Sequence, residues 1–132
     1  MKVLVTGGAG FIGSNLCRSL RAEGASVLAL DNLSTGFRTN LESSPDIEVL
    51  EGDVRHPDTV LAAVRGCEIV FHLAASVGNL RSIEDPVADS ETNVIGTLNV
   101  LQAARSIVPT GSSIPRPTRA REGPRSAMSE RR

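Results

Sequence analysis

Over the first 107 residues, short apolar runs alternate with longer segments in which apolar residues recur at helical spacing. The apolar runs predict strands at about 2–6, 26–30, 47–50 and 69–73. The other segments predict helices at about 11–23, 57–66 and 86–106, with a loop over 74–83. Strands that are nearly continuous in apolar residues and alternate with helices are typical of a parallel α/β sheet covered on both faces.

The connections between the strands predict the order of the sheet. Right-handed crossovers give the order 3-2-1-4, that of a Rossmann-type doubly wound sheet. The order reverses between the first and fourth strands, so a crevice is expected beyond their carboxyl ends. We expect one face of the first helix to carry Phe11, Ile12, Leu16 and Leu20. We expect a stripe on the last helix to carry Val87, Val94, Ile95, Leu98 and Leu101.

The turn between the first strand and the first helix is rich in glycine. Two spacings fit: Gly8, Gly10 and Gly13 match G-x-G-x-x-G, and Thr6, Gly7, Gly10 and Gly13 match T-G-x-x-G-x-x-G. The helix then opens with Phe11 and Ile12. Its first amides lack partners within the helix and the helix dipole is positive there, so a pyrophosphate would satisfy both. The pattern predicts a dinucleotide site, and an ordinary glycine-rich turn is the alternative.

An acidic residue ends the second apolar run. Asp31 can accept hydrogen bonds from the ribose hydroxyls of an adenosine, and its charge would repel a 2′-phosphate. This favours NAD over NADP as the cofactor, although Arg38 nearby leaves NADP open. The alternative is a turn residue or helix cap beside Asn32.

Length and composition narrow the class of protein. The chain has room for one domain, and without Trp or Tyr its core must be aliphatic. Cys17 and Cys67 lack metal-ligand spacing and are expected to be small buried residues in a reducing compartment. Two histidines, His56 and His72, do not cluster, so no metal site is expected. No apolar run reaches membrane-spanning length and no secretory signal precedes the first strand, so the expected location is the cytoplasm.

Five segments occur in the order and spacing of a known family. They are Thr6–Ser14, Asp31–Gly36, Gly52–Arg55, His72–Ala75 and Asn93–Thr97. With these segments the chain resembles, over about 1–107, the NAD-dependent epimerase/dehydratase family, which are extended short-chain dehydrogenase/reductases that act on sugar nucleotides. The segment Asp31–Gly36 particularly resembles that of UDP-glucose 4-epimerases.

The resemblance implies a set of cofactor-binding residues. Asp31 and Asn32 would contact the adenosine ribose, in a segment that continues through Ser34, Thr35 and Gly36. Asp53 and Val54 would border the adenine, and Leu73, Ala74 and Ala75 would pass beside the bridging phosphates and the nicotinamide ribose. Asn93 would support the site, and the loop 76–82 would face cofactor and substrate. Alternatives remain: Asp53 as a turn cap, Ala74 and Ala75 as packing residues, and Asn93 as a buried polar residue bonded to backbone.

The chain departs from the family where its proton chemistry should be. The family uses a Tyr-x-x-x-Lys pair, in which the lysine and the nicotinamide charge lower the pKa of the tyrosine. This chain has no tyrosine and a single lysine, Lys2, so no catalytic residue is assigned. We therefore expect 1–107 to be the NAD-binding portion of a sugar-nucleotide epimerase or dehydratase with a truncated sheet. A non-catalytic dinucleotide-binding module and an inert fragment are the alternatives.

The segment 108–132 differs in composition from the rest of the chain. Residues 109–132 carry six basic and two acidic residues and four prolines, whereas residues 1–108 carry eight basic and thirteen acidic residues. Prolines at this density exclude a central strand, and the composition predicts disorder. One hypothesis is a frameshift, because another reading frame over 111–117 can encode Phe-Ile-Tyr-Ser-Ser-Ser, like the family's fifth strand. A genuine basic tail that contacts nucleic acid or acidic lipid is the rival, disfavoured because it lacks aromatics and helical periodicity.

These expectations define the partners. A nucleotide-sugar substrate is expected for the family, with no nucleic acid and no membrane. An open sheet edge and an exposed apolar face at the fourth strand and last helix favour a homodimer or aggregation. The sequence does not specify the sugar, or choose between epimerase, dehydratase and reductase.

Overall fold

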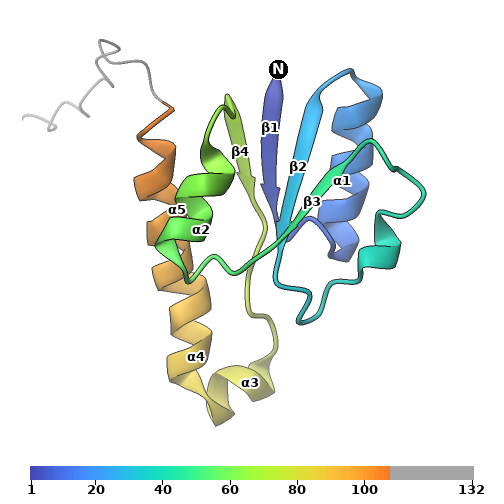
Figure 1. The fold of residues 1–132 in the computed structure, drawn as a ribbon. Helices are drawn as coiled ribbons and strands as arrows, with labels where there is room; N and C mark the ends of the chain where they lie inside the picture. Colours follow the sequence, from blue (N-terminus) through green and yellow to red (C-terminus); the bar gives the residue numbers. More distant parts are fainter. Residues whose placement is uncertain (108–132) are drawn as a thin grey trace, which may run out of the picture.

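A computed structural model describes residues 1–107, and the expectations for 108–132 lie outside this range. Four parallel strands form one sheet: β1 (Lys2–Thr6), β2 (Ser26–Asp31), β3 (Glu48–Glu51) and β4 (Ile69–His72) (Figure 1). Their order is β3-β2-β1-β4, so the order expected from the crossover rule is confirmed. The reversal of winding lies between β1 and β4.

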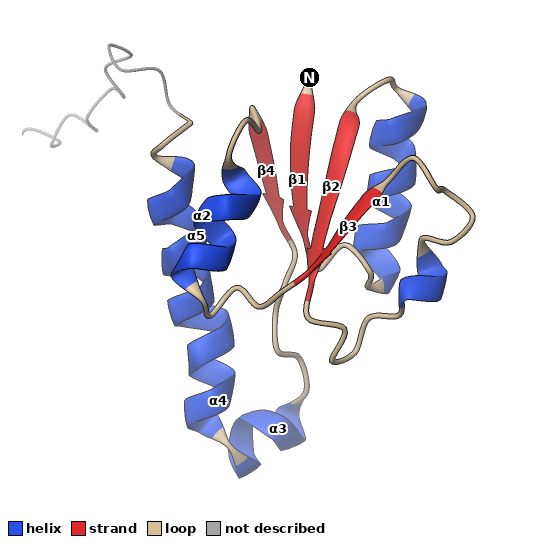
Figure 2. Ribbon diagram, viewed as in Figure 1, coloured by secondary structure: helices blue, strands red, loops and turns tan. Residues whose placement is uncertain are grey.

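Helices cover both faces of this sheet (Figure 2). Helix α1 (Phe11–Ala22) lies on one face, and α2 (Pro57–Val64) and α5 (Gly96–Ala104) lie on the other. Alternate residues of β1 supply the two cores, because successive side chains of a strand point to opposite faces. Val3 and Val5 pack on the α1 side, whereas Leu4 packs on the side of α2 and α5.

The last part of the described chain is a long helical run that extends beyond the carboxyl ends of the strands (Figure 1). It comprises α4 (Pro86–Ser90), the π-helical segment η2 (Glu91–Ile95) and α5. The expected helix over 86–106 is thus present, with a π-helical interior. The prediction of a loop over 74–83 is wrong in its second half, because helix α3 (Asn79–Glu84) begins within it. A 3₁₀ turn, η1 (Arg38–Asn40), lies between β2 and β3.

The face expected for α1 is wrong at its first turn. Phe11 and Ile12 are 84% and 69% exposed, whereas Leu16 and Leu20 pack against the core. The buried residues of α1 are the small ones: Gly13, Ser14 and Cys17. Small residues on the inner face let the helix lie close to the sheet and leave the larger side chains of its first turn outside.

Helix α5 also buries its smaller residues against the rest of the molecule. Its buried residues are Gly96, Val100 and Ala103, while the stripe expected from the sequence lies at the surface. A Cβ at Gly96 would come within 2.7 Å of Val54 Cγ2, so this helix approaches the chain after β3 more closely than a side chain would allow. The exposed stripe agrees with the apolar face expected at the last helix.

Both cysteines are free and buried, as the sequence predicts. Burial raises the pKa of the Cys17 thiol to about 11, because it disfavours the thiolate. Within residues 1–107 there is no group of His, Cys, Asp and Glu side chains suited to a metal ion. No helix in that range is both long and apolar enough to cross a membrane.

Candidate binding site at the carboxyl edge of the sheet

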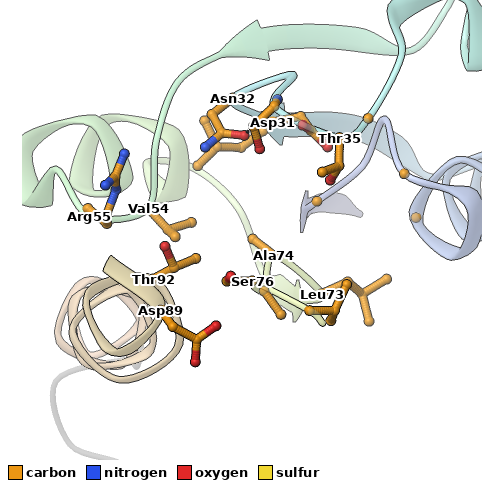
Figure 3. Close-up of a pocket in the computed structure, with 18 of the residues that line it drawn as sticks. Asp31, Asn32, Thr35, Val54, Arg55, Leu73, Ala74, Ser76, Asp89 and Thr92 are labelled. Carbon is orange, nitrogen blue, oxygen red and sulfur yellow. Dashed lines mark hydrogen bonds between the residues drawn. The ribbon is translucent and has the colours of Figure 1, made fainter. Parts of the chain in front are cut away.

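A cavity of about 710 Å³ opens at the carboxyl ends of the strands. The glycine-rich turn after β1, the segments after β2, β3 and β4, and the long helical run all line it, and Figure 3 shows labelled side chains from the last four of these. Asp31 and Asn32 come from the end of β2, Val54 and Arg55 follow β3, Leu73 and Ala74 follow β4, and Asp89 and Thr92 come from the helical run. This is where a crevice is expected in a sheet of this order.

The glycine-rich turn forms one wall and has no room for side chains. Gly7 has a φ of +68°, and a Cβ there would lie 2.8 Å from the Ala74 amide nitrogen. A Cβ at Gly13 would overlap the carbonyl oxygen of Gly7. Gly10 is the N-cap of α1, brings no capping side chain, and is followed by a first turn without acidic residues. The first amides of α1 are therefore open toward the cavity, which Gly10, Phe11, Ile12 and Gly13 line.

The carboxylate of Asp31 is buried beside this turn. Its Oδ2 accepts a hydrogen bond from the Ala9 amide and its Oδ1 accepts one from the Leu33 amide, both at 2.9 Å. Leu33 has a φ of 55°, which turns the chain sharply after β2. A Cβ at Gly36 would lie 3.0 Å from both carboxylate oxygens, so Gly36 lies directly against Asp31. Ser34, Thr35 and Gly36 all line the cavity. Each carboxylate oxygen keeps a free lone pair for a ligand hydroxyl.

Asp53 lies behind the cavity wall instead of on it. Its carboxylate accepts two hydrogen bonds from the Arg55 guanidinium, at 3.0 and 2.8 Å, and one from Asn32 Nδ2 at 2.9 Å. These bonds, the Arg55 side chain first, hold the pKa of the Asp53 carboxyl far below its usual value. Arg55 also lies 3.7 Å from a Glu91 carboxylate oxygen. Asp53 therefore fixes Asn32 and Arg55, which both line the cavity.

Asn93 also acts from behind the wall. Its Oδ1 accepts from the Ser76 amide at 2.8 Å, and its Nδ2 donates to the Ser76 carbonyl at 2.9 Å. The same Nδ2 is 3.2 Å from Asp89 Oδ2. Asn93 thus holds the peptide that follows Leu73, Ala74 and Ala75, all of which line the cavity.

The structure therefore brings together the residues expected from the sequence, with Asp53 and Asn93 one layer behind. Several lining residues were not expected, chiefly Arg55 and the group Asp85, Ala88, Asp89 and Thr92. The spacing of that group, three or four residues apart, would place it on one face of a helix and was the available signal. These residues reach the cavity only because the helical run extends past the carboxyl edge of the sheet. The spacing of the residues does not predict that position of the run.

Comparisons with known proteins find sequence similarity over most of the chain. The model of the NAD dependent epimerase/dehydratase family matches residues 3–115. A UDP-glucose 4-epimerase of Mycolicibacterium smegmatis is 45% identical over 109 residues, which are 80% of this chain and 35% of that protein. UDP-glucuronic acid decarboxylase 2 of Arabidopsis thaliana is 38% identical over 81% of this chain and 24% of its own length. This chain thus spans about a third or less of the curated relatives it matches.

Solved structures of UDP-glucose 4-epimerases are similar to this chain in fold. The Thermus thermophilus UDP-glucose 4-epimerase, crystallised in complex with NAD, superposes with a TM-score of 0.75 at 44% identity, over 81% of this chain and 34% of that chain. The Thermotoga maritima UDP-glucose 4-epimerase with UDP-glucose has a TM-score of 0.76 at 36% identity, over 81% and 35%. Both likenesses cover nearly the whole described part of this chain.

Proposed function

This chain belongs to the NAD-dependent epimerase/dehydratase family, and on that premise we propose that residues 1–107 bind NAD in the cavity at the carboxyl edge of the sheet. The observation that carries the proposal is the meeting of open helix amides and a buried carboxylate in one cavity. The amides at the start of α1 would hold the pyrophosphate, and Asp31 would accept from the ribose hydroxyls. When bound, NAD supplies a hydride acceptor and donor.

The other lining segments would hold the remaining parts of the dinucleotide. Val54, with Asn32 and Arg55 fixed by Asp53, would border the adenine. Leu73, Ala74 and Ala75 would pass beside the bridging phosphates and the nicotinamide ribose, with the Ser76 peptide held by Asn93. The small side chains of the alanines support this role, because they leave room for a ligand against the strand end.

We propose NAD in preference to NADP. The Asp31 carboxylate would repel a 2′-phosphate, since the two charges would share a partly enclosed site. Arg38, the cation that could attract such a phosphate, donates from Nη2 to Glu51 Oε2 at 3.4 Å. That pair lies beside the end of β2, because Asp31 and Glu51 are register partners in the sheet.

For the substrate and the reaction, family membership is the main support. We propose that the chain derives from an enzyme that transfers a hydride between NAD and a nucleotide-sugar. The 132 residues contain no tyrosine, so they do not supply the phenolic proton donor and acceptor of the family. The chain itself is therefore proposed to bind the dinucleotide without turning over a nucleotide-sugar, and to self-associate through its exposed apolar stripe.

Calorimetric titration of the full chain with NAD and NADP tests this function. We expect NAD to bind roughly tenfold more tightly than NADP, the factor set by about 1.4 kcal/mol of charge repulsion. Asp31→Asn should reduce that preference, whereas Glu42→Gln, which removes an exposed charge outside the cavity lining, should not. Failure of both cofactors to bind a cooperatively melting chain would contradict the proposal, and the absence of a cooperative melt would identify an inert fragment.

A further inference from the structure

His72 ends β4 and connects three parts of the molecule. Its Nδ1 lies 2.7 Å from Thr6 Oγ1 at the end of β1, and its Nε2 lies 3.1 Å from Thr97 Oγ1 on α5. We propose that His72, as a neutral ring protonated on Nε2, is a positioning residue that fixes the 73–76 segment for dinucleotide binding and releases it in acid. The link to the dinucleotide rests on the function proposed above.

The hydrogen bonds of the two threonines determine which ring nitrogen carries the proton. Thr6 Oγ1 accepts from the amides of Leu73 and Ala74, at 3.1 and 3.2 Å, and the Leu73 amide also donates to the Thr6 carbonyl at 3.1 Å. Both of its lone pairs are then in use, so its own hydrogen points to Nδ1. Thr97 Oγ1 donates to the Asn93 carbonyl at 2.7 Å, so it accepts from Nε2–H. Only the neutral Nε2–H form satisfies every group.

This chain of bonds holds the cavity wall at both ends. The Thr6 hydroxyl that donates to His72 also fixes the amides of Leu73 and Ala74. The other end of the segment, Ser76, is held by Asn93, one helical turn before Thr97. The segment must be placed closely, because the backbone of Leu73 and Ala74 fills the space beside Gly7 where a side chain would otherwise lie.

Protonation of His72 would break the arrangement. A charged ring must donate from Nδ1 as well, so the Thr6 hydroxyl hydrogen loses its acceptor and Thr6 Oγ1 has to give up one of its two amide donors. The Leu73 amide would keep its bond to the Thr6 carbonyl, whereas the Ala74 amide depends on Thr6 Oγ1. No carboxylate compensates among the described residues: β1 presents Thr6 and α5 presents Thr97, while Asp89 accepts from Asn93 and Glu91 pairs with Arg55. Burial lowers the pKa of His72 below 6.5, in keeping with a ring that stays neutral. The bonds are therefore intact above about pH 6.5 and are lost as the pH falls through the lowered pKa.

The test measures NAD affinity from about pH 7.5 to about pH 5, around the ordinary histidine pKa. We expect affinity to fall about fivefold in acid, the factor for one lost hydrogen bond. His72→Gln keeps a donor for Thr97 but cannot titrate, so its affinity should not change with pH. His56→Gln, which removes the exposed histidine at the N-cap of α2, should retain the full pH dependence.

A second measurement does not need the cofactor. Nitrogen-15 NMR of the free chain at neutral pH should show His72 as the Nε2–H tautomer, with Nδ1 unprotonated. An Nδ1–H or charged ring there, or an acid loss of affinity unchanged in His72→Gln, would overturn the inference. The expected tautomer with no NAD binding at any pH would overturn the proposed function and the role of His72 in it, while leaving the hydrogen-bond assignment standing.

Discussion

Two glycines of the turn before α1 differ in how they would tolerate a methyl group. A Cβ at Gly13 would overlap the Gly7 carbonyl, whereas a Cβ at Gly10 would lie 3.3 Å from that same oxygen. The first clash involves two backbone segments that cannot move apart without shifting α1 from the sheet. The second needs an adjustment of a few tenths of an ångström. Packing within the protein thus requires a glycine at position 13. It does not require one at position 10, where we infer that the ligand does.

We therefore predict opposite effects for the two alanine variants. Gly13→Ala should lower the free energy of unfolding by about 3 kcal/mol, the upper range for overpacking. Gly10→Ala should cost less than about 1 kcal/mol but weaken NAD binding, because the methyl group stands at the open amides. Urea unfolding and calorimetric titration of both variants measure the two quantities. Equal destabilisation by both would contradict this division of roles.

Among the elements, the turn between β3 and α2 depends on one ion pair. Arg55 makes two hydrogen bonds to Asp53, and their side chains are 39% and 11% exposed. Because the pKa of Asp53 is lowered, its ionised form stabilises the fold above the ordinary value of 3.8, and this contribution is lost as the pH falls below it. The Arg38–Glu51 pair has side chains 53% and 64% exposed and should contribute little.

Replacing Arg55 and Arg38 one at a time compares the contributions of the two ion pairs to stability. Arg55→Met should destabilise the chain by about 1–3 kcal/mol at pH 7, because it leaves the Asp53 carboxylate without its charged partner. It should also make stability less sensitive to pH below about 3.8, since Asp53 then titrates nearer its unfolded value. Arg38→Met should change stability by less than about 0.5 kcal/mol. Urea unfolding at several pH values provides the measurement, and similar losses for both variants would refute the distinction.

The elements also show what the sequence could predict. Apolar runs such as 69–73 and the crossover rule were sufficient for the strands and their order, because both depend on local pattern and chain chirality. The face of α1 was misjudged at its first turn, because close contact with the sheet favours small residues, as at Gly13, over the large apolar ones that dominate a helical stripe. The position of Asp53 behind the cavity was not predictable, because it depends on the Arg55 side chain folding back over it.

At the scale of the whole molecule, an exposed apolar stripe runs along η2 and α5. Val94, Leu98 and Leu101 are 55%, 47% and 59% exposed in the described structure. Helix α5 packs beside β4, the open edge strand, where Ile69 and the following Leu73 are each 38% exposed. An exposed apolar helix face beside an open sheet edge favours association.

We predict that the chain self-associates in solution and that charge on this stripe prevents it. The double variant Leu98→Glu, Leu101→Glu should sediment as a monomer at concentrations where the parent chain is larger. Phe37→Glu, at a single exposed position next to η1, should leave the association unchanged. Sedimentation velocity over a range of concentrations decides the matter. A monomeric parent chain, or equal effects of both changes, would show that the stripe is not the contact.

The order of the strands also has a consequence in time. β1 is synthesised before the other three strands of this sheet but takes an inner place in it, between β2 and β4. At typical rates of synthesis, several seconds separate its emergence from that of β4. Throughout that delay, one side of the segment Val3–Val5 lacks the strand to which it will hydrogen-bond. The nascent chain is therefore most prone to incorrect strand pairing at residues that are fully buried in the folded structure.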